Sequence, residues 1–387
     1  MKKILIVFLS LICLVSFYSC NKKEKPAASV PGIKIASSLN VLYKENLVTT
    51  ISYIPLRTSD DYLIQAVSKL MVDDSLIFVV DGIQNTIFIY DFFGVPVSKI
   101  HAVGNGLGEY LYITDAYVDP HAHTVNIYNL NMNKILSYDY SGNFIKDAFV
   151  NRKYAYFVIK QPASSFYISE MRDPGVKNIL SAFNDKQIID EAISVQNREA
   201  YAPYLACLRG SSFATYNDTV FFLSIFDYSI YSFKNGHFKK EYDLIMDDNL
   251  KISSIKSVPK STKSSLDIID DYTAQGIISR LSNLTISKEY ISFCIDIIGK
   301  GFLHYNILYD RRTHESVFYE DLYSNGERLY QPPFVCFYKN HFLFYLQSQK
   351  ELDYLVKTGA IQSTDYETPV ICLVDLAEEH IHNQQPI

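Results

Sequence analysis

A segment in the first third of the chain recurs 48 residues further on, and this repeat constrains the fold more than any other feature. Each copy has an apolar strand, a short polar turn, a second strand that ends in Tyr-Asp or its equivalent, and a hairpin turn closed by Gly. Gly fits there because a tight hairpin needs a backbone conformation with positive φ. A sheet of this size cannot bury both of its apolar faces alone, so the units must stack on one another. The coinciding positions are Asp81 with Asn129, Asn85 with Asn133, Tyr90-Asp91 with Tyr138-Asp139, and Gly94 with Gly142.

Four weaker copies of this unit follow at residues 166–185, 220–236, 290–310 and 341–375. Units of roughly 50 residues are typical of propeller blades. The early segment 48–56 lies outside the first unit and would complete the last one. We therefore predict an all-β fold, a six-bladed β-propeller of four-stranded antiparallel blades whose ring is closed by this N-terminal strand. Two stretches, 191–210 and 246–275, interrupt the pattern as insertions, either on a binding face or as surface loops with no role.

Composition agrees with strands and excludes one class of partner. Aromatic residues make up 14% of the 387 residues, with only 15 Gly and 13 Pro, as expected of a sheet-rich globular chain. The formal net charge of −6 argues against the concentrated basic surface that a nucleic-acid backbone requires. We therefore expect no nucleic-acid partner.

The N-terminus is typical of an exported chain. Lys2 and Lys3 precede an apolar run over residues 4–17, which is followed by Ser19-Cys20. The run is shorter than the roughly 20 residues of a membrane-spanning helix, so it is expected to be a cleaved signal peptide. The Ser-Cys pair resembles a bacterial lipobox, in which the cysteine is acylated after cleavage. We predict lipidation at Cys20 and membrane attachment through that lipid; a signal cleaved without acylation is the alternative.

The residues behind Cys20 are polar and unpatterned, as a flexible tether should be. Three lysines outnumber the single acid in residues 21–25, whereas surface-exported lipoproteins commonly carry acidic residues there. We therefore expect an outer-membrane lipoprotein of the cell envelope that faces the periplasm. The predicted organisation is a signal peptide over 1–19, a lipidated tether over 20–45, the propeller over 46–377 and a C-terminal tail over 378–387.

Four cysteines remain once the signal peptide and Cys20 are set aside. In an exported protein they allow three disulfide pairings. Three of the four lie inside apolar runs, where cysteine is commonly a small buried hydrophobic residue. We predict free buried thiols, with disulfide pairing as the alternative, for Cys207, Cys294, Cys336 and Cys372.

Several segments of the first two units resemble a known family. They are Tyr53-Ile54-Pro55-Leu56, the strand over residues 74–81, the segment 89–94 (Ile-Tyr-Asp-Phe-Phe-Gly) and the loop 103–110 (Val-Gly-Asn-Gly-Leu-Gly-Glu-Tyr). Together they resemble the six-bladed β-propeller lipoproteins abundant in Bacteroidetes, which are similar to NHL-type propellers. The resemblance is sharp over residues 53–149. It implies a propeller in the cell envelope and, for most members, no established activity.

The loop 103–110 carries the most distinctive local motif, three alternating glycines followed by Glu109 and Tyr110. It is not a dinucleotide-binding fingerprint, because no helical pattern follows and the glycine spacing differs. The glycines would let the connection between two blades turn sharply, which is a structural role. The alternative is that Glu109 and Tyr110 bind a ligand at the mouth of the channel.

Asp81 and Asn129 end equivalent strands of consecutive units and are a second pair of candidate ligand-binding residues. Carboxylate and amide oxygens repeated around a ring suit Ca²⁺, whereas capping of the following turn is the structural alternative. The pairs His121-x-His123 and His380-x-His382 would place two imidazoles on one face of an extended strand, but neither pair brings further ligands. We predict no cofactor and no metal ligand, with Ca²⁺ at Asp81 and Asn129 as the alternative.

No residue set forms a catalytic constellation, so we expect a non-catalytic binding or interaction module. Its unknown ligand, a small molecule, glycan, peptide or partner protein, would be held at the mouth of the channel. The alternative is a metal-dependent hydrolase or lyase with its site in the central channel. Clustered Asp, Asn, Glu or His on the axis would favour the enzyme, and an axis lined by Tyr, Phe and backbone would favour binding. A purely structural role predicts a large exposed apolar patch on the outside of the ring.

Overall fold

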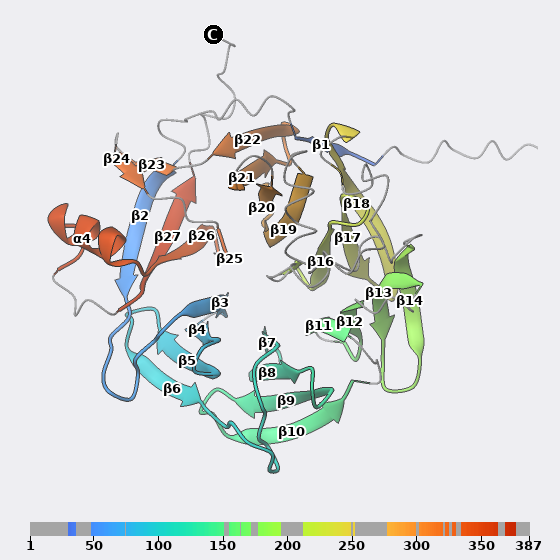
Figure 1. Cartoon of the computed structure of the whole chain (residues 1–387), viewed down its shortest axis with the longest axis horizontal. Helices are drawn as coiled ribbons and strands as arrows, with labels where there is room; N and C mark the ends of the chain where they lie inside the picture. Colours follow the sequence, from blue (N-terminus) through green and yellow to red (C-terminus); the bar gives the residue numbers. More distant parts are fainter. Residues whose placement is uncertain are drawn as a thin grey trace, which may run out of the picture. The chain divides into compact units, whose positions relative to one another are not determined.

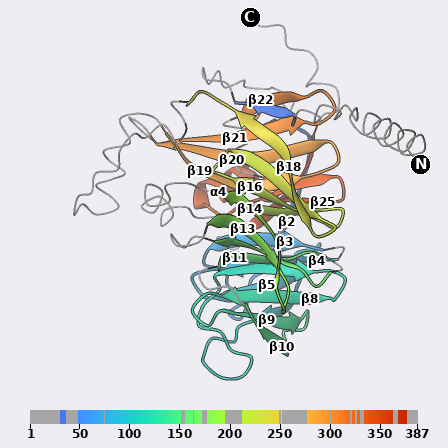
Figure 2. The ribbon, with the colours of Figure 1, turned by 90° about the vertical axis from the view of Figure 1, so that its right-hand side faces the viewer.

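The strands form six small antiparallel sheets that are arranged in a ring within Gly32–Ile387, as the blades of a β-propeller (Figure 1). The predicted fold class is confirmed. Turned by 90°, the strands of the first two blades run across the view in successive layers (Figure 2). The computed structural model describes residues 30–35, 48–73, 75–150, 155–162, 164–171, 177–194, 212–248, 251, 277–298, 302–319, 322–324, 327–329, 334–362 and 368–376.

We number the blades along the chain and give their strands from the axis outward. Blade 1 has β3 (Val67–Val72), β4 (Leu76–Asp81), β5 (Thr86–Asp91) and β6 (Pro96–Ile100). Blade 2 has β7 (Asp115–Asp119), β8 (Thr124–Asn129), β9 (Lys134–Asp139) and β10 (Phe144–Phe149). Blade 3 has β11 (Ala155–Lys160), β12 (Tyr167–Met171), β13 (Asn178–Phe183) and β14 (Ile188–Ser194).

The second half of the ring has the same arrangement. Blade 4 has β15 (Phe213–Tyr216), β16 (Thr219–Ser224), β17 (Ser229–Lys234) and β18 (His237–Ile245). Blade 5 has β19 (Ile277–Ile286), β20 (Tyr290–Ile298), β21 (Phe302–Asp310) and β22 (Glu315–Tyr319). Blade 6 has β25 (Cys336–Tyr338), β26 (His341–Leu346), β27 (Val370–Leu376) and β2 (Val48–Pro55).

The ring is closed by pairing the N-terminal strand β2 with the C-terminal strand β27. The register runs antiparallel from Val48 opposite Leu376 to Pro55 opposite Val370. This confirms the prediction that the early apolar segment completes the last blade. Closure joins residues more than 300 positions apart, and it holds blade 6 beside blade 1, so that the apolar faces an open array would expose are packed against each other.

A short strand, β1 (Gly32–Lys34), adds a fifth strand to the outside of blade 4. It pairs parallel with β18, from Gly32 opposite Asp243 to Lys34 opposite Ile245. The side chain of Ile33 is fully buried against this blade. The range 20–45 was assigned to a tether, and within it the structure describes residues 30–35, where this pairing occurs.

The repeated residues build the same hairpin twice. Oδ1 of Asp91 accepts the backbone N–H of Phe93 and Val95 at 2.8 and 2.9 Å, and Oδ1 of Asp139 accepts two backbone N–H groups in the same way. Gly94 and Gly142 follow with φ of 72° and 89°. Each hairpin lies against the outermost strand of the preceding blade, which explains why both turns require Gly.

Apolar clusters fill the spaces between blades. One cluster joins blades 1 and 2, another joins blades 2 and 3, a third joins blades 5 and 6, a fourth joins blades 6 and 1, and the largest extends from blade 3 to blade 5. The alternating and continuous apolar strands of the repeat therefore bury both faces of each sheet, as stacking requires.

Two elements lie outside the blade pattern. Helix α4 (Gln349–Lys357) is inserted between β26 and β27 and starts with a capping box formed by Ser348 and Glu351. Leu352 and Leu355 of this helix are buried in the cluster between blades 5 and 6. Strands β23 (Leu322–Ser324) and β24 (Glu327–Leu329) form a separate hairpin. Of the two predicted insertions, the structure describes residues 191–194, which end β14, and residues 246–248 and 251.

Candidate binding site in the central channel

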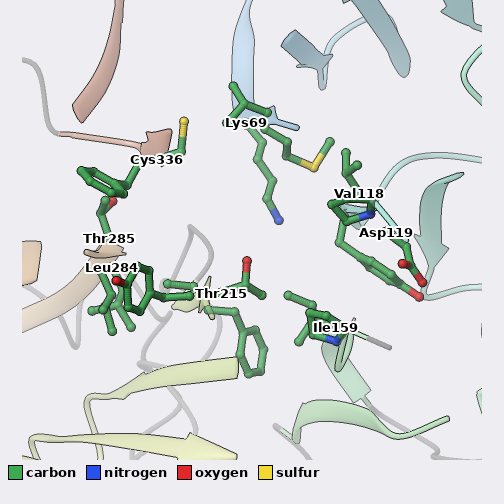
Figure 3. A pocket seen from close by; sticks show the side chains of 18 of the residues that line it. Lys69, Val118, Asp119, Ile159, Thr215, Leu284, Thr285 and Cys336 are labelled. Atoms are coloured by element: carbon green, nitrogen blue, oxygen red, sulfur yellow. The ribbon is translucent and has the colours of Figure 1, made fainter. Parts of the chain in front are cut away.

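The innermost strands of the six blades enclose a cavity of about 300 Å³. Residues of β3, β7, β11, β15, β19 and β25 or their adjoining turns line it, so the cavity depends on closure of the ring and no single blade could form it. Its volume lies at the lower end of the range for small-molecule sites. Figure 3 shows the side chain of Lys69 extending into the middle of this space, with Thr215, Ile159 and Leu284 around it.

An ion pair between blades 1 and 2 holds Lys69 in place. Its Nζ lies 2.6 Å from Asp115 Oδ1 and donates to the backbone oxygen of Ala116 at 2.7 Å. Asp115 Oδ1 also accepts the N–H of Ala116 at 2.8 Å. The side chain of Lys69 is 27% exposed, whereas that of Asp115 is only 4% exposed. The carboxylate is therefore enclosed, and the ammonium group is the exposed end of the pair.

A second ion pair, between blades 2 and 3, has the same arrangement. Nζ of Lys160 lies 2.9 Å from Asp119 Oδ2, and Asp119 Oδ1 accepts the N–H of Ala122 at 3.2 Å. The exposed fractions are again 27% for the lysine and 5% for the aspartate. Each carboxylate thus has an ammonium partner and a backbone partner, which a buried charge requires.

Apolar and hydroxyl-bearing side chains complete the wall. Burial raises the pKa of Tyr117 well above its ordinary value, and the nearby Tyr167, Asp119 and Asp115 act in the same direction. This phenol is therefore neutral at physiological pH. Thr215 of blade 4 is exposed to the cavity, and Thr285 of the neighbouring blade 5 also lines it (Figure 3). The apolar members of the wall include Met71, Val118, Ile159, Phe213, Leu284 and Phe337.

One mouth of the channel lies where the innermost strand of each blade turns into the second strand; we call it the inner-turn mouth. Here His121, in the turn after β7, has its Nε2 3.2 Å from Oδ1 of Asp218, in the turn after β15. Gln161, from the blade between them, donates its side-chain amide to the backbone oxygen of Asp218 at 3.3 Å. Turns of three consecutive blades therefore meet at this mouth.

Asp81, a predicted ligand-binding residue, is fully buried at the end of β4. Its Oδ1 accepts the backbone N–H of Ile83 and Gln84 at 2.9 and 3.0 Å. Its Oδ2 accepts the N–H of Gln65 at 2.6 Å and the side-chain amide of Gln84 at 2.8 Å. The carboxylate thus caps the turn after β4 and fixes the loop before β3.

Asn129 occupies the equivalent place in blade 2 and is also fully buried. Its Oδ1 accepts the N–H of Met132 at 3.0 Å, and its Nδ2 donates to the backbone oxygen of Tyr112 at 3.0 Å. The two repeated residues therefore perform the same local task, one with a carboxylate and one with an amide. Ca²⁺ binding at these two residues stays an alternative to this capping role.

Glu109 and Tyr110 lie in the connection between blades 1 and 2. Oε2 of Glu109 accepts the N–H of Gly106 at 2.7 Å, and a Cβ at Gly104 would lie 2.0 Å from the same oxygen, so the loop folds around this carboxylate. Tyr110 is fully buried, and its hydroxyl donates to the backbone oxygen of Asn85 at 2.8 Å. Neither residue lies in the wall of the cavity, and the same holds for Asp81 and Asn129. Ligand binding by these four residues stays a prediction.

His121 and His123 lie in the turn between β7 and β8 rather than in the extended strand that the sequence suggested. His123 has a φ of 49° and packs edge-on against Tyr140, whereas His121 faces Asp218. The backbone turn therefore sends the two imidazoles to different partners. Within the described ranges, no three His, Cys, Asp or Glu side chains come together as a metal site would need. Cys20, His380 and His382 lie outside the described residues.

The cysteines that the structure describes are free thiols: Cys294 and Cys372 are buried as predicted, whereas Cys336 is only partly buried because it borders the cavity. Burial raises the pKa of Cys294 to about 12. Cys207 lies outside the described residues. In the part of the chain that the structure covers, no helix has the length and apolar character needed to span a membrane.

Sequence reasoning missed the residues that line the cavity. The second and third strands of each blade make the repeat visible, whereas the innermost strands of the first three blades, β3, β7 and β11, carry charges that break the apolar pattern. Lys69, Asp115 and Asp119 are such charges. In these three blades, a charged residue in the segment before the strand pair is the signal that could have found them; β15 and β25 carry no charge.

Comparison with solved structures supports the fold. A Bacteroides fragilis NCTC 9343 protein that is described as exported superposes with a TM-score of 0.66 at 13% identity, over 90% of this chain and all of that one. A DUF4221 family member from Bacteroides vulgatus ATCC 8482 gives 0.51 at 10% identity, over 86% and 98%. At these identities the likeness concerns the fold alone.

Sequence comparison places the chain in a family. No curated protein matches the sequence. The family described as "Domain of unknown function (DUF4934)" matches residues 30–374, which begin just before β1 and end within β27. The match thus includes all six blades and both N-terminal strands. The chain therefore belongs to the DUF4934 family.

Proposed function

We propose that this chain is a binding protein of the cell envelope whose ligand occupies the central channel. The observation that carries the proposal is the cavity of about 300 Å³, whose wall combines apolar side chains with a few charged and hydroxyl groups. Small-molecule sites commonly have this composition. The two lysines are held by ion pairs between blades before any ligand arrives, which lowers the entropic cost of ordering them on binding.

The envelope location rests on the N-terminal sequence. The signal peptide over 1–19 and acylation of Cys20 would leave residues 20–31 between the lipid and β1. Twelve residues span at most about 40 Å, so the propeller would stay close to the membrane. We propose the outer membrane and its periplasmic face, because lysines outnumber acids directly after Cys20.

The anchor is tested by replacing one residue. Wild type should incorporate radiolabelled palmitate and fractionate with the outer membrane, and Cys20→Ser should do neither. Digestion of the wild-type protein by protease on intact cells, before the envelope leaks, would contradict the periplasmic face. Unchanged labelling of Cys20→Ser would contradict the lipidation site.

The channel site is tested with a variant that fills it. Thr215 is exposed to the cavity, so Thr215→Phe removes cavity volume without displacing a buried contact, and Thr215→Ser is the matched control that leaves the space open. A library of small acidic, basic and neutral compounds is screened for a rise in melting temperature. The proposal expects at least one compound that binds wild type and Thr215→Ser with unit stoichiometry and does not bind Thr215→Phe.

Two results would contradict the channel proposal. One is that no compound binds, and the other is that every binding compound tolerates Thr215→Phe. The metal-dependent hydrolase or lyase enters as a separate arm. Elemental analysis of the dialysed protein and a melt with and without chelator would favour that alternative if they revealed near-stoichiometric Ca or Zn and a chelator-sensitive melt.

A further inference from the structure

Each ion pair of the channel wall exposes its lysine more than its aspartate, and this orientation favours a ligand of negative charge. We propose that the channel binds a small organic anion with an apolar body, and that Lys69, whose side chain extends into the middle of the cavity, binds its charged head group. This inference rests on the proposed channel site and names the chemical class of its ligand.

The two members of each ion pair differ in exposure. The aspartate side chains are 4% and 5% exposed and the lysine side chains are each 27% exposed. The formal charges of the pairs cancel, but a molecule in the cavity meets the ammonium ends first and the carboxylates behind them. Because charge interactions weaken with distance, the wall presents positive potential to the cavity at these two places.

Both lysines keep hydrogen-bond donors for a ligand, because an ammonium group has three N–H donors. Lys69 uses one on Asp115 and one on the backbone oxygen of Ala116, and in the described part of the chain Lys160 uses one on Asp119. Asp115 and Asp119 lie four residues apart on β7, about 13 Å along the strand, so the two ammonium groups are separate sites. Since an exposed ammonium bonds well to an anionic oxygen, a carboxylate or phosphate head group would use the remaining donor of Lys69.

The other charged groups of the wall lie at the inner-turn mouth. They are His121 and Asp218, which face each other across it. The Asp218 carboxylate already has an imidazole partner there. Lys160 ends β11 directly before Gln161, which bonds to Asp218, so Lys160 lies at this same mouth, whereas Lys69 extends into the middle of the cavity (Figure 3). The phenol of Tyr117 is neutral because burial raises its pKa.

The rest of the ligand would meet an apolar part of the wall. Side chains from blades 2, 3 and 5 border the cavity there, namely Val118, Ile159 and Leu284 (Figure 3). Apolar contact of this kind favours burial of an alkyl or aryl group. A ligand with an anionic head and an apolar body satisfies both parts of the wall, whereas an inorganic ion would leave the apolar part hydrated.

The test uses four probes with one body: hexanoate, hexyl phosphate, hexanol and hexylamine. Their dissociation constants are measured by calorimetry or ligand-observed NMR on the full chain carrying Cys20→Ser, which prevents acylation. We expect the tighter of the two anions to bind about tenfold or more tightly than hexanol, and hexylamine to bind worst. Whichever anion is tighter identifies the head group as carboxylate or phosphate.

Variants assign the effect to Lys69. Lys69→Met alone would leave a buried carboxylate unpaired, so the informative variant is Lys69→Met with Asp115→Asn, which removes both charges of the pair together. It should reduce the preference for the anion over hexanol to about threefold or less. Lys99→Met is the control, because Lys99 pairs with Asp61 outside the cavity, and it should keep the full preference.

Three outcomes would overturn the inference. They are equal binding of anion and alcohol by wild type, preference for hexylamine, and an unchanged anion preference in the double variant. Failure of all four probes would overturn it as well. If other compounds of the library are then excluded by Thr215→Phe, the channel remains a binding site and only the anion inference fails.

Discussion

Gly94→Ala tests how closely blade 1 packs against the strand that closes the ring. Gly94 lies in the hairpin between β5 and β6 with a φ of 72°. A Cβ added there would lie 2.1 Å from the backbone oxygen of Pro55 and 3.0 Å from its carbonyl carbon, in β2 of blade 6. Backbone atoms of a paired strand cannot rotate aside as a flexible side chain can, so the hairpin or the closing strand must move.

Two contributions set the size of the effect. An L-residue in the left-handed region costs about 1 to 2 kcal/mol. Forcing a methyl group into a filled contact costs about 1 to 3 kcal/mol more. We therefore expect the free energy of unfolding to fall by about 2 to 5 kcal/mol, a large share of the 5 to 15 kcal/mol typical of a folded domain.

The chain offers a control that isolates the first contribution. Gly359, directly after the C-cap of α4, also has a φ of 72°, but no atom lies within 4 Å of a Cβ built on it. Gly359→Ala should therefore lower the free energy of unfolding only by the cost of the left-handed backbone, about 1 to 2 kcal/mol. Gly142→Ala, whose Cβ would meet the backbone oxygen of Lys99 at 2.6 Å, should resemble Gly94→Ala.

The assay is equilibrium unfolding in urea, monitored by tyrosine fluorescence and by circular dichroism to check that the transitions coincide. The expected order of destabilisation is Gly94→Ala, then Gly142→Ala, then Gly359→Ala. Equal losses at Gly94 and Gly359 would refute the reasoning, because they would show that the hairpin has room for a methyl group beside β2.

Three further predictions concern the mouth, the thiols and the response to pH. His121→Ala should speed amide hydrogen exchange in the turn that holds Asn217 and Asp218 and leave exchange in β4 unchanged. The free energy of unfolding should fall by less than about 0.5 kcal/mol, because the lost pair is exposed. Unchanged exchange at this turn would contradict the contact. Burial raises the pKa of Cys294 to about 12 from 9.0, so iodoacetamide should alkylate it at pH 8 about a thousandfold more slowly in the native chain than in urea. Alkylation is followed by peptide mass spectrometry, and equal rates would contradict its burial. Burial likewise raises the pKa of Tyr110 to about 12 from 10.0. The neutral phenol's contribution to stability is therefore complete below pH 10 and is lost as the pH rises toward 12, by up to about 1.4 kcal/mol per pH unit. In urea melts between pH 10 and 11, the free energy of unfolding should fall less steeply for Tyr110→Phe than for wild type, and parallel falls would contradict the assignment.

The propeller was predictable because its signal is local. In each unit, apolar strands alternate with short turns whose Asp, Asn and Gly residues satisfy specific backbone positions, and Asn85 and Asn133 both adopt positive φ in the structure. Closure by residues 48–56 was predictable for a different reason, since one apolar strand was left over at the start and one blade was short of a strand at the end.

Two elements were not predicted from the sequence, because their signals are short or depend on tertiary contact. Ser348 and Glu351 at capping-box spacing, followed by Leu352 and Leu355 on one face, are the sequence signal of helix α4. A helix of nine residues shows too little hydrophobic periodicity to be predicted from this signal. Strand β1 has only three residues, and it is held by pairing with β18 more than 200 positions away. No local pattern encodes such a partner.

The candidate site was not predicted from the sequence, and the reason follows from the repeat itself. At the offset of 48 residues, the turn residues of blades 1 and 2 match, and the structure shows that Asp81 and Asn129 both cap the same kind of turn. The innermost strands match at a different offset: Lys69 pairs with Val80 and Asp115 with the equivalent Tyr128, so Lys69 and Asp115 occupy equivalent positions 46 residues apart. At this offset Asp119 corresponds to Asp73, and both carboxylates accept N–H groups of the turn that follows. Positions that repeat around a ring are those that every blade needs for its own fold. Positions on the axis are free to differ from blade to blade, so the opposite charges at Lys69 and Asp115 are better candidates for ligand recognition than the residues that make the repeat visible.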